Sequence, residues 1–313
     1  MNPPPGHWWA DLPPAAGAAV NATGIISIGL HQTGHDSLSL AALALTGLLW
    51  LLLAGDFAAR LLGDRARFEA EADTPPALTA VAATTVLGVR LSLFGWQTVA
   101  AILLVLATVC WPGLMFTVVR HWQRRMPGAA FLVCVATQGL SVLAAVLAAG
   151  GRRDWLDWAA LVCFFLGLLL YLDALLRFDF RQVATGAGDQ WVAGGALAIS
   201  ALAGSKLTAS PVWAGAAHTA LRTATLGLLA LALGWYAVLA VAEARWPRPH
   251  YDIRRWATVF PLGMTAAACL STADATGIDW PHTVGQVLLW IAVAAWVLTA
   301  VGLGAARSDD LRP

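Results

Sequence analysis

Long apolar runs alternate with short polar breaks along the whole chain. Runs of about 20 apolar residues are long enough to cross a bilayer as helices, and ten of them can be marked. The expected spans are 14–33, 38–62, 75–94, 96–119, 129–150, 156–177, 190–209, 219–243, 254–275 and 282–305. The pattern predicts a single all-α transmembrane domain over residues 1–313.

The composition supports a membrane protein. Hydrophobic residues make up 59% of the chain and charged residues only 12%, whereas soluble domains carry about 25% charged residues. The net charge of +1 offers no basic surface for nucleic acid. Residues 1–12 contain no Lys or Arg before the first apolar run, so a cleaved signal peptide is not expected.

Positive charge is unequally divided between the two sides that ten spans would create. The side that holds both termini and the loops after even-numbered spans has 14 of the 19 Lys and Arg residues. The positive-inside rule therefore places both termini in the cytoplasm. Removing one span from the count would destroy this asymmetry.

Odd-numbered and even-numbered spans differ in kind. The even ones are smooth and rich in leucine, whereas the odd ones carry small and hydroxyl residues. Thr23, Thr84, Thr137 and Ser200 recur at intervals of 53 to 63 residues, which is the length of one helical hairpin. The interval predicts five hairpins with odd helices inside and even helices facing lipid. Small residues that only allow close helix packing would give the same composition.

The ninth apolar segment is interrupted at Phe260, Pro261 and Gly263. Proline removes a backbone donor and glycine relaxes the helix, so a break here is tolerated only against protein or a water-filled cavity. Broken helices mark transport sites in many carriers. We therefore interpret Phe260, with Pro261, as a candidate pore gate, the alternative being an ordinary core aromatic.

Five segments, in order and at hairpin spacing, resemble one known family. They are 22–27, 83–90, 135–140, 196–204 and 255–263, which are similar to its first, third, fifth, seventh and ninth helices. The family is the tellurite-resistance/dicarboxylate transporter family, which includes bacterial TehA, yeast malate and sulfite permeases and plant slow anion channels. The resemblance covers nearly the whole chain.

The resemblance implies ten helices in five hairpins around a central quasi-five-fold pore, with one pore per protomer, usually in a trimer. A phenylalanine on the ninth helix blocks the family's pore midway, and Phe260 is the only Phe in that segment. Some relatives kink several inner helices with proline. Here only the ninth has an internal proline, and glycines are expected to supply the other bends, namely Gly24, Gly88, Gly139, Gly194 and Gly195.

Hydroxyl residues on the odd spans are candidates to line the pore. Their weak dipoles could replace part of an anion's hydration without binding it tightly, or each hydroxyl could bond back to its own helix. The candidates are Thr23, Thr84, Thr137, Ser200 and Thr265.

Arg90 and Lys206 close two odd spans on the predicted outer side. A basic rim there would raise the local anion concentration, whereas the alternative is snorkelling toward lipid phosphate. On the first interpretation we expect Arg90→Ala to lower anion flux with little change in folding.

The expected function is a passive anion channel or uniporter of the cytoplasmic membrane. The alternative is a proton-coupled dicarboxylate carrier, or an exporter of sulfite or tellurite-related anions. No enzyme, cofactor or metal is expected, because the seven histidines lie at span ends or in loops and no nucleophile elbow or phosphate loop appears. The expected partners are small inorganic or carboxylate anions, the lipid bilayer and further copies in a homotrimer.

Overall fold

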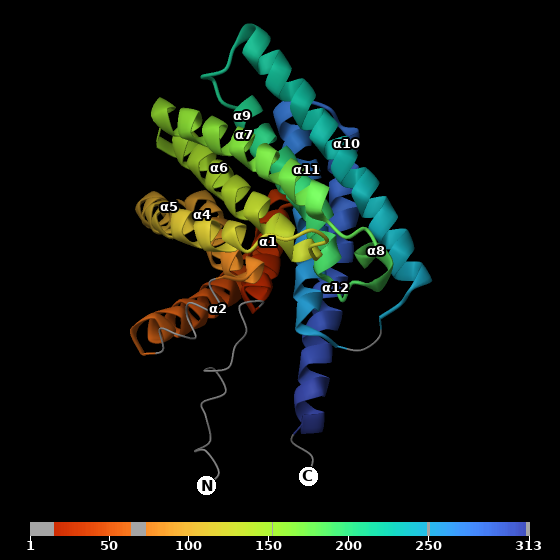
Figure 1. Ribbon diagram of the computed structural model, residues 1–313. Coiled ribbons are helices and arrows are strands. Elements are labelled where there is room, and N and C mark those ends of the chain that lie inside the picture. Colours follow the sequence, from red (N-terminus) through yellow and green to blue (C-terminus); the bar gives the residue numbers. More distant parts are fainter. Residues whose placement is uncertain (1–15, 64–72, 152, 249–250, 311–313) are drawn as a thin grey trace.

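The computed structural model describes residues 16–63, 73–151, 153–248 and 251–310 of the protein, with the side chains of 307–310 left aside. The N-terminal stretch examined for a signal peptide lies outside these residues. Ten long helices account for most of the described chain (Figure 1). They are α1 (Gly17–Gln32), α2 (Asp36–Gly63), α4 (Thr79–Leu93), α5 (Gln97–Arg120), α6 (Leu132–Gly151), α7 (Asp154–Arg177), α9 (Val192–Thr208), α10 (Gly215–Arg245), α11 (Trp256–Thr276) and α12 (Trp280–Asp310).

Short turns precede four of the long helices. These are the 3₁₀ segments η3 (Pro75–Leu78), η4 (Gly128–Phe131), η5 (Asp189–Trp191) and η6 (Ile253–Arg255), which lead into α4, α6, α9 and α11. A four-residue helix, α8 (Gln182–Thr185), lies between α7 and η5.

Burial alternates from one long helix to the next. In the most apolar 18-residue window, α6 with η4 is 100% buried, whereas α2 is 17% buried. The inner helices are α1, α4, α6, α9 and α11, and the outer helices are α2, α5, α7, α10 and α12. An outer helix that exposes leucine, valine and tryptophan along its length is stable only against lipid or another apolar surface.

The inner helices form a closed ring. Each packs against two others in the order α1, α4, α6, α9, α11 and back to α1. Each outer helix packs on the inner helix before it in the chain and also on the inner helix of the next hairpin, and α12 returns to α1. The all-α membrane fold predicted from the sequence is confirmed, and these contacts add the cyclic order of its helices.

Eight of the long helices are long and apolar enough to cross a membrane. The other two, α1 and α9, have 16 and 17 residues, below the roughly 20 that a lipid-exposed span requires. Both belong to the inner ring, where protein rather than lipid surrounds the ends of the helix. The ten spans expected from the sequence stay a prediction at these two helices.

Close approach of inner helices depends on glycine on both sides of Phe260. A Cβ atom on Gly195 of α9 would lie 2.8 Å from Cγ of Pro261, and one on Gly263 would lie 2.8 Å from Cγ2 of Ile25. Any larger residue would have to push neighbouring helices apart. The segment that carries Phe260 therefore lies in close contact with both α9 and α1.

Candidate functional site

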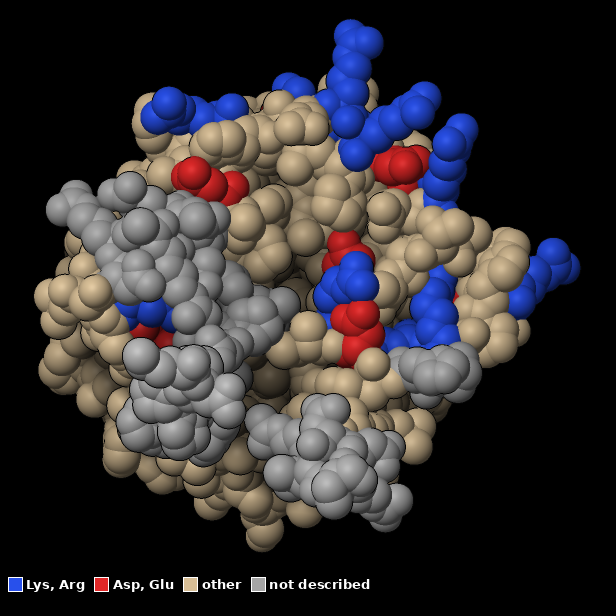
Figure 2. Space-filling view, turned by 60° about the horizontal axis from the view of Figure 1, so that its bottom comes forward, with Lys and Arg blue, Asp and Glu red and all other residues tan. Residues whose placement is uncertain are grey.

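One cavity is shared by all five inner helices. Its volume is about 230 Å³, and we call it the axial vestibule. The N-terminal segments of the five inner helices line it, through Ala18, Asn21, Pro75, Pro76, Thr79, Pro127, Ala129, Leu132, Asp189, Val192, Arg254, Ala257 and Phe260. Since each of these helices contributes its first turns, all five begin at this end of the ring. The face of the molecule at this end has a hollow near its middle, with acidic and basic side chains along the edge (Figure 2).

Phe260 lines the inner part of the vestibule. Arg254, Ala257 and Phe260 recur every three residues along η6 and α11, and all three face the cavity. Phe260 is only 3% exposed, so its ring lies among the inner helices and not against lipid.

Pro261 interrupts the hydrogen bonding of α11 directly beside the ring. Proline has no N–H to donate to the carbonyl of Ala257, four residues earlier, and its ring crowds that carbonyl. The carbonyl of Pro261 itself accepts a bond from Thr265 Oγ1 at 2.8 Å. The backbone next to Phe260 is thus less constrained by helix bonds than the rest of α11.

The only cationic side chain that lines the vestibule among the described residues is Arg254. Its Nε and Nη2 donate to the two carboxylate oxygens of Asp252 at 3.0 and 2.8 Å. The same carboxylate accepts the backbone N–H of Arg254 at 2.9 Å, which caps η6. The hydrogen bonds from the Arg254 side chain hold the pKa of Asp252 below its usual range.

Asp189 supplies the vestibule's one carboxylate in the described chain. It is 7% exposed, and its Oδ2 accepts the backbone N–H of Ala129 at 3.2 Å. The neighbouring Gly188 has a φ of +139° and lies so close to the Arg254 carbonyl that a Cβ atom would not fit. Thr258 Oγ1 donates to the Gly188 carbonyl at 3.2 Å. These contacts hold Asp189 close to Arg254.

In the sequence, Arg254 counts only as one of the 14 Lys and Arg residues on the side of the two termini, and Asp189 was not a candidate site residue. One feature of the sequence could have identified both residues as site residues, because each lies within three positions of the start of an inner helix. A charged residue there is placed at the vestibule once the five helix starts converge.

The five candidate hydroxyls share one arrangement. Each donates to the carbonyl four residues earlier in its own helix at 2.7 to 2.8 Å. Three also accept an indole N–H from an outer helix, in the pairs Trp296–Thr23, Trp50–Thr84 and Trp111–Thr137. These three hydroxyls therefore face the outer helices. Pore lining by the five side chains stays a prediction, and the hydrogen bonds do not favour it for these three.

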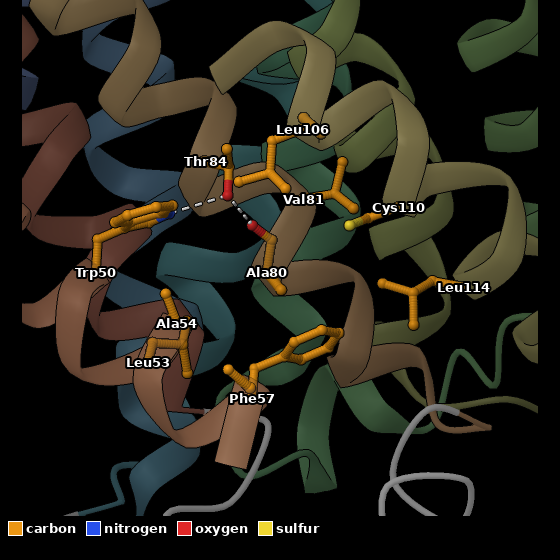
Figure 3. Close-up of a pocket in the computed structure, with 12 residues that line it drawn as sticks. Trp50, Leu53, Ala54, Phe57, Ala80, Val81, Thr84, Leu106, Cys110 and Leu114 are labelled. Carbon is orange, nitrogen blue, oxygen red and sulfur yellow. Dashed lines mark hydrogen bonds between the residues drawn. The ribbon is translucent and has the colours of Figure 1, made fainter. Parts of the chain in front are cut away.

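The Trp50–Thr84 bond borders an apolar groove between α2, α4 and α5 (Figure 3). The groove has a volume of about 230 Å³ and includes Phe57, Cys110 and Leu114. Its lining comes from the two outer helices α2 and α5 and from one inner helix, α4. We assign it to the lipid-facing surface.

The two residues expected to form a basic rim lie at different helix junctions. Arg90 is 2% exposed, and its Nε and Nη2 donate to Ser39 Oγ of α2 at 3.1 and 2.9 Å. Its Nη1 is buried and has no hydrogen-bond partner among the residues that the structure describes. Lys206 is half-buried near the end of α9, where the charge of Asp274 acts on it. The structure does not bring the two cations together, and the rim stays a prediction.

The described residues contain no group of three His, Cys, Asp or Glu side chains that could hold a metal ion. All four cysteines are free thiols, and two of them, Cys134 and Cys269, are buried. Cys134 Sγ lies 3.8 Å from both Ser200 Oγ and the carbonyl of Ala196, so it packs between α6 and α9.

The chain is similar to a family of anion channels and to two membrane proteins. The family described as SLAC1, voltage-dependent anion channel, matches residues 11–303. Two uncharacterized membrane proteins of Mycobacterium tuberculosis, from strains H37Rv and CDC 1551, are each 29% identical over 141 residues. Each alignment covers 43% of this chain and 71% of the relative.

Proposed function

Because the chain belongs to the voltage-dependent anion channel (SLAC1) family, we propose that it is a passive anion channel or uniporter of the cytoplasmic membrane. The match confirms the family resemblance predicted from the sequence. Members of this family are anion channels or transporters embedded in membranes. The finer proposal is that the five inner helices enclose the path and that Phe260 closes it.

The observation that carries this proposal is the axial vestibule. Five inner helices contribute to a single cavity, and Phe260 lines its inner part while remaining 3% exposed. A hydrophobic constriction of this kind excludes water and ions until the side chain moves away. The interrupted helix bonding at Pro261 supplies backbone freedom for such a movement. We assign the structure to a closed state.

The parallel direction of the inner helices favours anions at the vestibule. Each helix carries a partial positive charge at its N-terminus, because its first N–H groups have no partner within the helix. Five such ends surround the same cavity. Their summed field attracts a small anion without the tight binding that a fixed central charge would impose.

The orientation follows from the excess of Arg on this side of the ring. We propose that the vestibule and both termini face the cytoplasm, and that Lys206 adds positive charge near the opposite mouth. A homotrimer with one path per protomer is proposed from the family resemblance alone.

The test uses purified protein reconstituted in liposomes, with chloride or nitrate efflux as the readout. We expect Phe260→Ala to raise efflux above that of the wild type. Phe116→Ala is the matched control, because Phe116 is 63% exposed on the outer helix α5. Unchanged efflux in a folded Phe260→Ala protein would remove Phe260 from the gate.

One observation favours a second candidate, the proton-coupled carrier of dicarboxylate or related anions. A coupled carrier needs a titratable group in its path, and Asp189 lines the vestibule with 7% exposure. The discriminating measurement is anion uptake driven by a proton gradient. Uptake that requires the gradient and is lost in Asp189→Asn would favour the carrier, whereas conduction without a gradient would favour the channel.

A further inference from the structure

The charges at the vestibule do not match the simplest expectation for an anion path. The described lining residues include one cation, Arg254, and one carboxylate, Asp189. A second carboxylate, Asp252, binds Arg254 through two hydrogen bonds. The three side chains together carry a net charge of −1, which opposes the field of the helix N-termini.

We propose that Arg254 is the anion-binding group of the vestibule and that Asp252 and Asp189 hold it in a screened state that limits anion entry. This inference rests on the proposed function. The ligand is a small monovalent anion such as chloride or nitrate. As it enters, it binds the guanidinium of Arg254 either together with Asp252 or in place of Asp252.

The position of Arg254 supports this role. Arg254, Ala257 and Phe260 lie on one face of the η6–α11 segment, so the guanidinium precedes the gate along the same wall. Its side chain remains 52% exposed although it is paired. An anion approaching Phe260 from this end therefore meets Arg254 first.

Screening by Asp252 is built into the local backbone. Asp252 caps η6 by accepting the Arg254 N–H, and the same carboxylate binds the Arg254 side chain. The paired carboxylate and guanidinium are two residues apart, so the pair forms without any tertiary rearrangement. Bidentate carboxylate–arginine pairs are among the stronger hydrogen-bonded contacts in proteins.

Screening by Asp189 depends on tertiary contacts. Its carboxylate lines the same cavity as the Arg254 side chain and accepts the Ala129 N–H at the start of η4. The close contact between Gly188 and the Arg254 carbonyl holds the two segments together. Three of the five inner helices thus meet at this charge cluster.

Amide substitutions separate charge from structure at both acids. Asparagine keeps a side-chain oxygen, so Asp252→Asn can still cap η6 and Asp189→Asn can still accept from Ala129. Each variant removes one negative charge with little change of shape. The matched control is Asp179→Asn. Asp179 lies in the loop after α7, outside the vestibule lining, and its carboxylate accepts the Arg181 N–H, so this variant also removes one negative charge from a hydrogen-bonded carboxylate.

The experiment measures chloride current across planar bilayers for the full chain carrying Phe260→Ala. We expect Asp252→Asn and Asp189→Asn each to raise the current by about two- to tenfold, because removing a single charge gives an effect at or below the lower end of the range for a whole charged cleft. Arg254→Gln should lower the chloride current. When Arg254→Gln is combined with Asp252→Asn, the increase in current that Asp252→Asn gives alone should disappear. Asp179→Asn should match the parent.

Two outcomes overturn the inference while leaving the proposed path in place. Currents of Asp252→Asn and Asp189→Asn equal to that of Asp179→Asn would show that the acids do not screen entry. An unchanged current in Arg254→Gln would show that the guanidinium does not contact the anion. A silent Phe260→Ala parent is a different result, because it contradicts the proposed path closed by Phe260, and the inference, which rests on that path, falls with it. Thermal unfolding in detergent confirms that each variant is folded.

Discussion

The indole N–H of Trp296 donates to Thr23 Oγ1 at 2.9 Å, joining residues 273 positions apart. Trp296 lies on the last outer helix and Thr23 on the first inner helix, so the bond spans the junction where the ring closes. The pairs Trp50–Thr84 and Trp111–Thr137 repeat it at two other junctions, at 2.9 and 3.0 Å. In each pair the outer helix of one hairpin binds the inner helix of the next.

The closing bond predicts a measurable loss of stability. We expect Trp296→Phe, which keeps the aromatic ring but removes the donor, to lower the free energy of unfolding by about 1 kcal/mol. Thr23→Val should cost a similar amount, and the double variant should cost less than the sum of the two. Thermal unfolding in detergent measures the effect. Thr299→Val is the control, because the Thr299 hydroxyl bonds to Ala295 on its own helix; equal losses there would deny the pair a special role.

A size series at position 260 tests the gate beyond the alanine variant. If the ring closes the path, conductance should rise in the order Phe, Leu, Ala, because each step removes apolar volume from the barrier. Phe260→Trp should conduct no more than the wild type. Single-channel recording in planar bilayers gives the conductance, and a series without any dependence on side-chain size would argue for a gate elsewhere.

Arg90 should behave as a structural residue as well as a charge. The sequence suggested that Arg90→Ala would leave folding nearly unchanged, but the guanidinium is buried and donates two bonds to Ser39. We now expect Arg90→Ala to lower the free energy of unfolding by about 1.5–3 kcal/mol, the range for hydrogen bonds to charged groups. Lys206→Ala, at a half-buried position, is the comparison. Anion flux measured per folded protein then separates the two effects, and wild-type stability in Arg90→Ala would contradict the structural role.

The pairing of Asp252 with Arg254 predicts a pH-dependent contribution to stability. Hydrogen bonding to Arg254 lowers the pKa of Asp252 in the folded protein. A carboxyl whose pKa is lower in the folded than in the unfolded protein stabilises the fold at pH values above its pKa in the unfolded chain, which is near 3.9. This contribution is lost as the pH falls through the pKa of the folded state. The wild type should therefore be more stable than Asp252→Asn at pH 7, and the difference should shrink below about pH 4. A stability difference between the wild type and Asp252→Asn that does not change with pH would show that the ion pair is not its cause.

Much of the architecture was predictable because it follows from hydrophobicity and period. The apolar runs gave ten segments, and each corresponds to one long helix within a few residues. The spacing of Thr23, Thr84 and Thr137 gave the hairpin length, since one residue type recurs at equivalent places in successive hairpins. The polar breaks also gave the side on which the Arg residues gather.

The direction of individual side chains was not predictable in the same way. Thr84 and Thr137 recur on inner helices, but period alone does not say which face of a helix meets the ring axis. Arg90 stands at the end of an apolar run, where snorkelling or a rim was the natural expectation, yet Ser39 of α2 holds it inside the protein.

The sequence by itself determined the number of long helices, their alternation between inner and outer positions and the family, because hydrophobicity, repeat length and local motifs are properties of short segments. Only the tertiary structure decided that Asp189, Arg254 and Phe260 share one cavity. These residues come from the starts of two inner helices that meet only when successive hairpins pack together, and a contact between segments far apart in the chain has no signature within either of them.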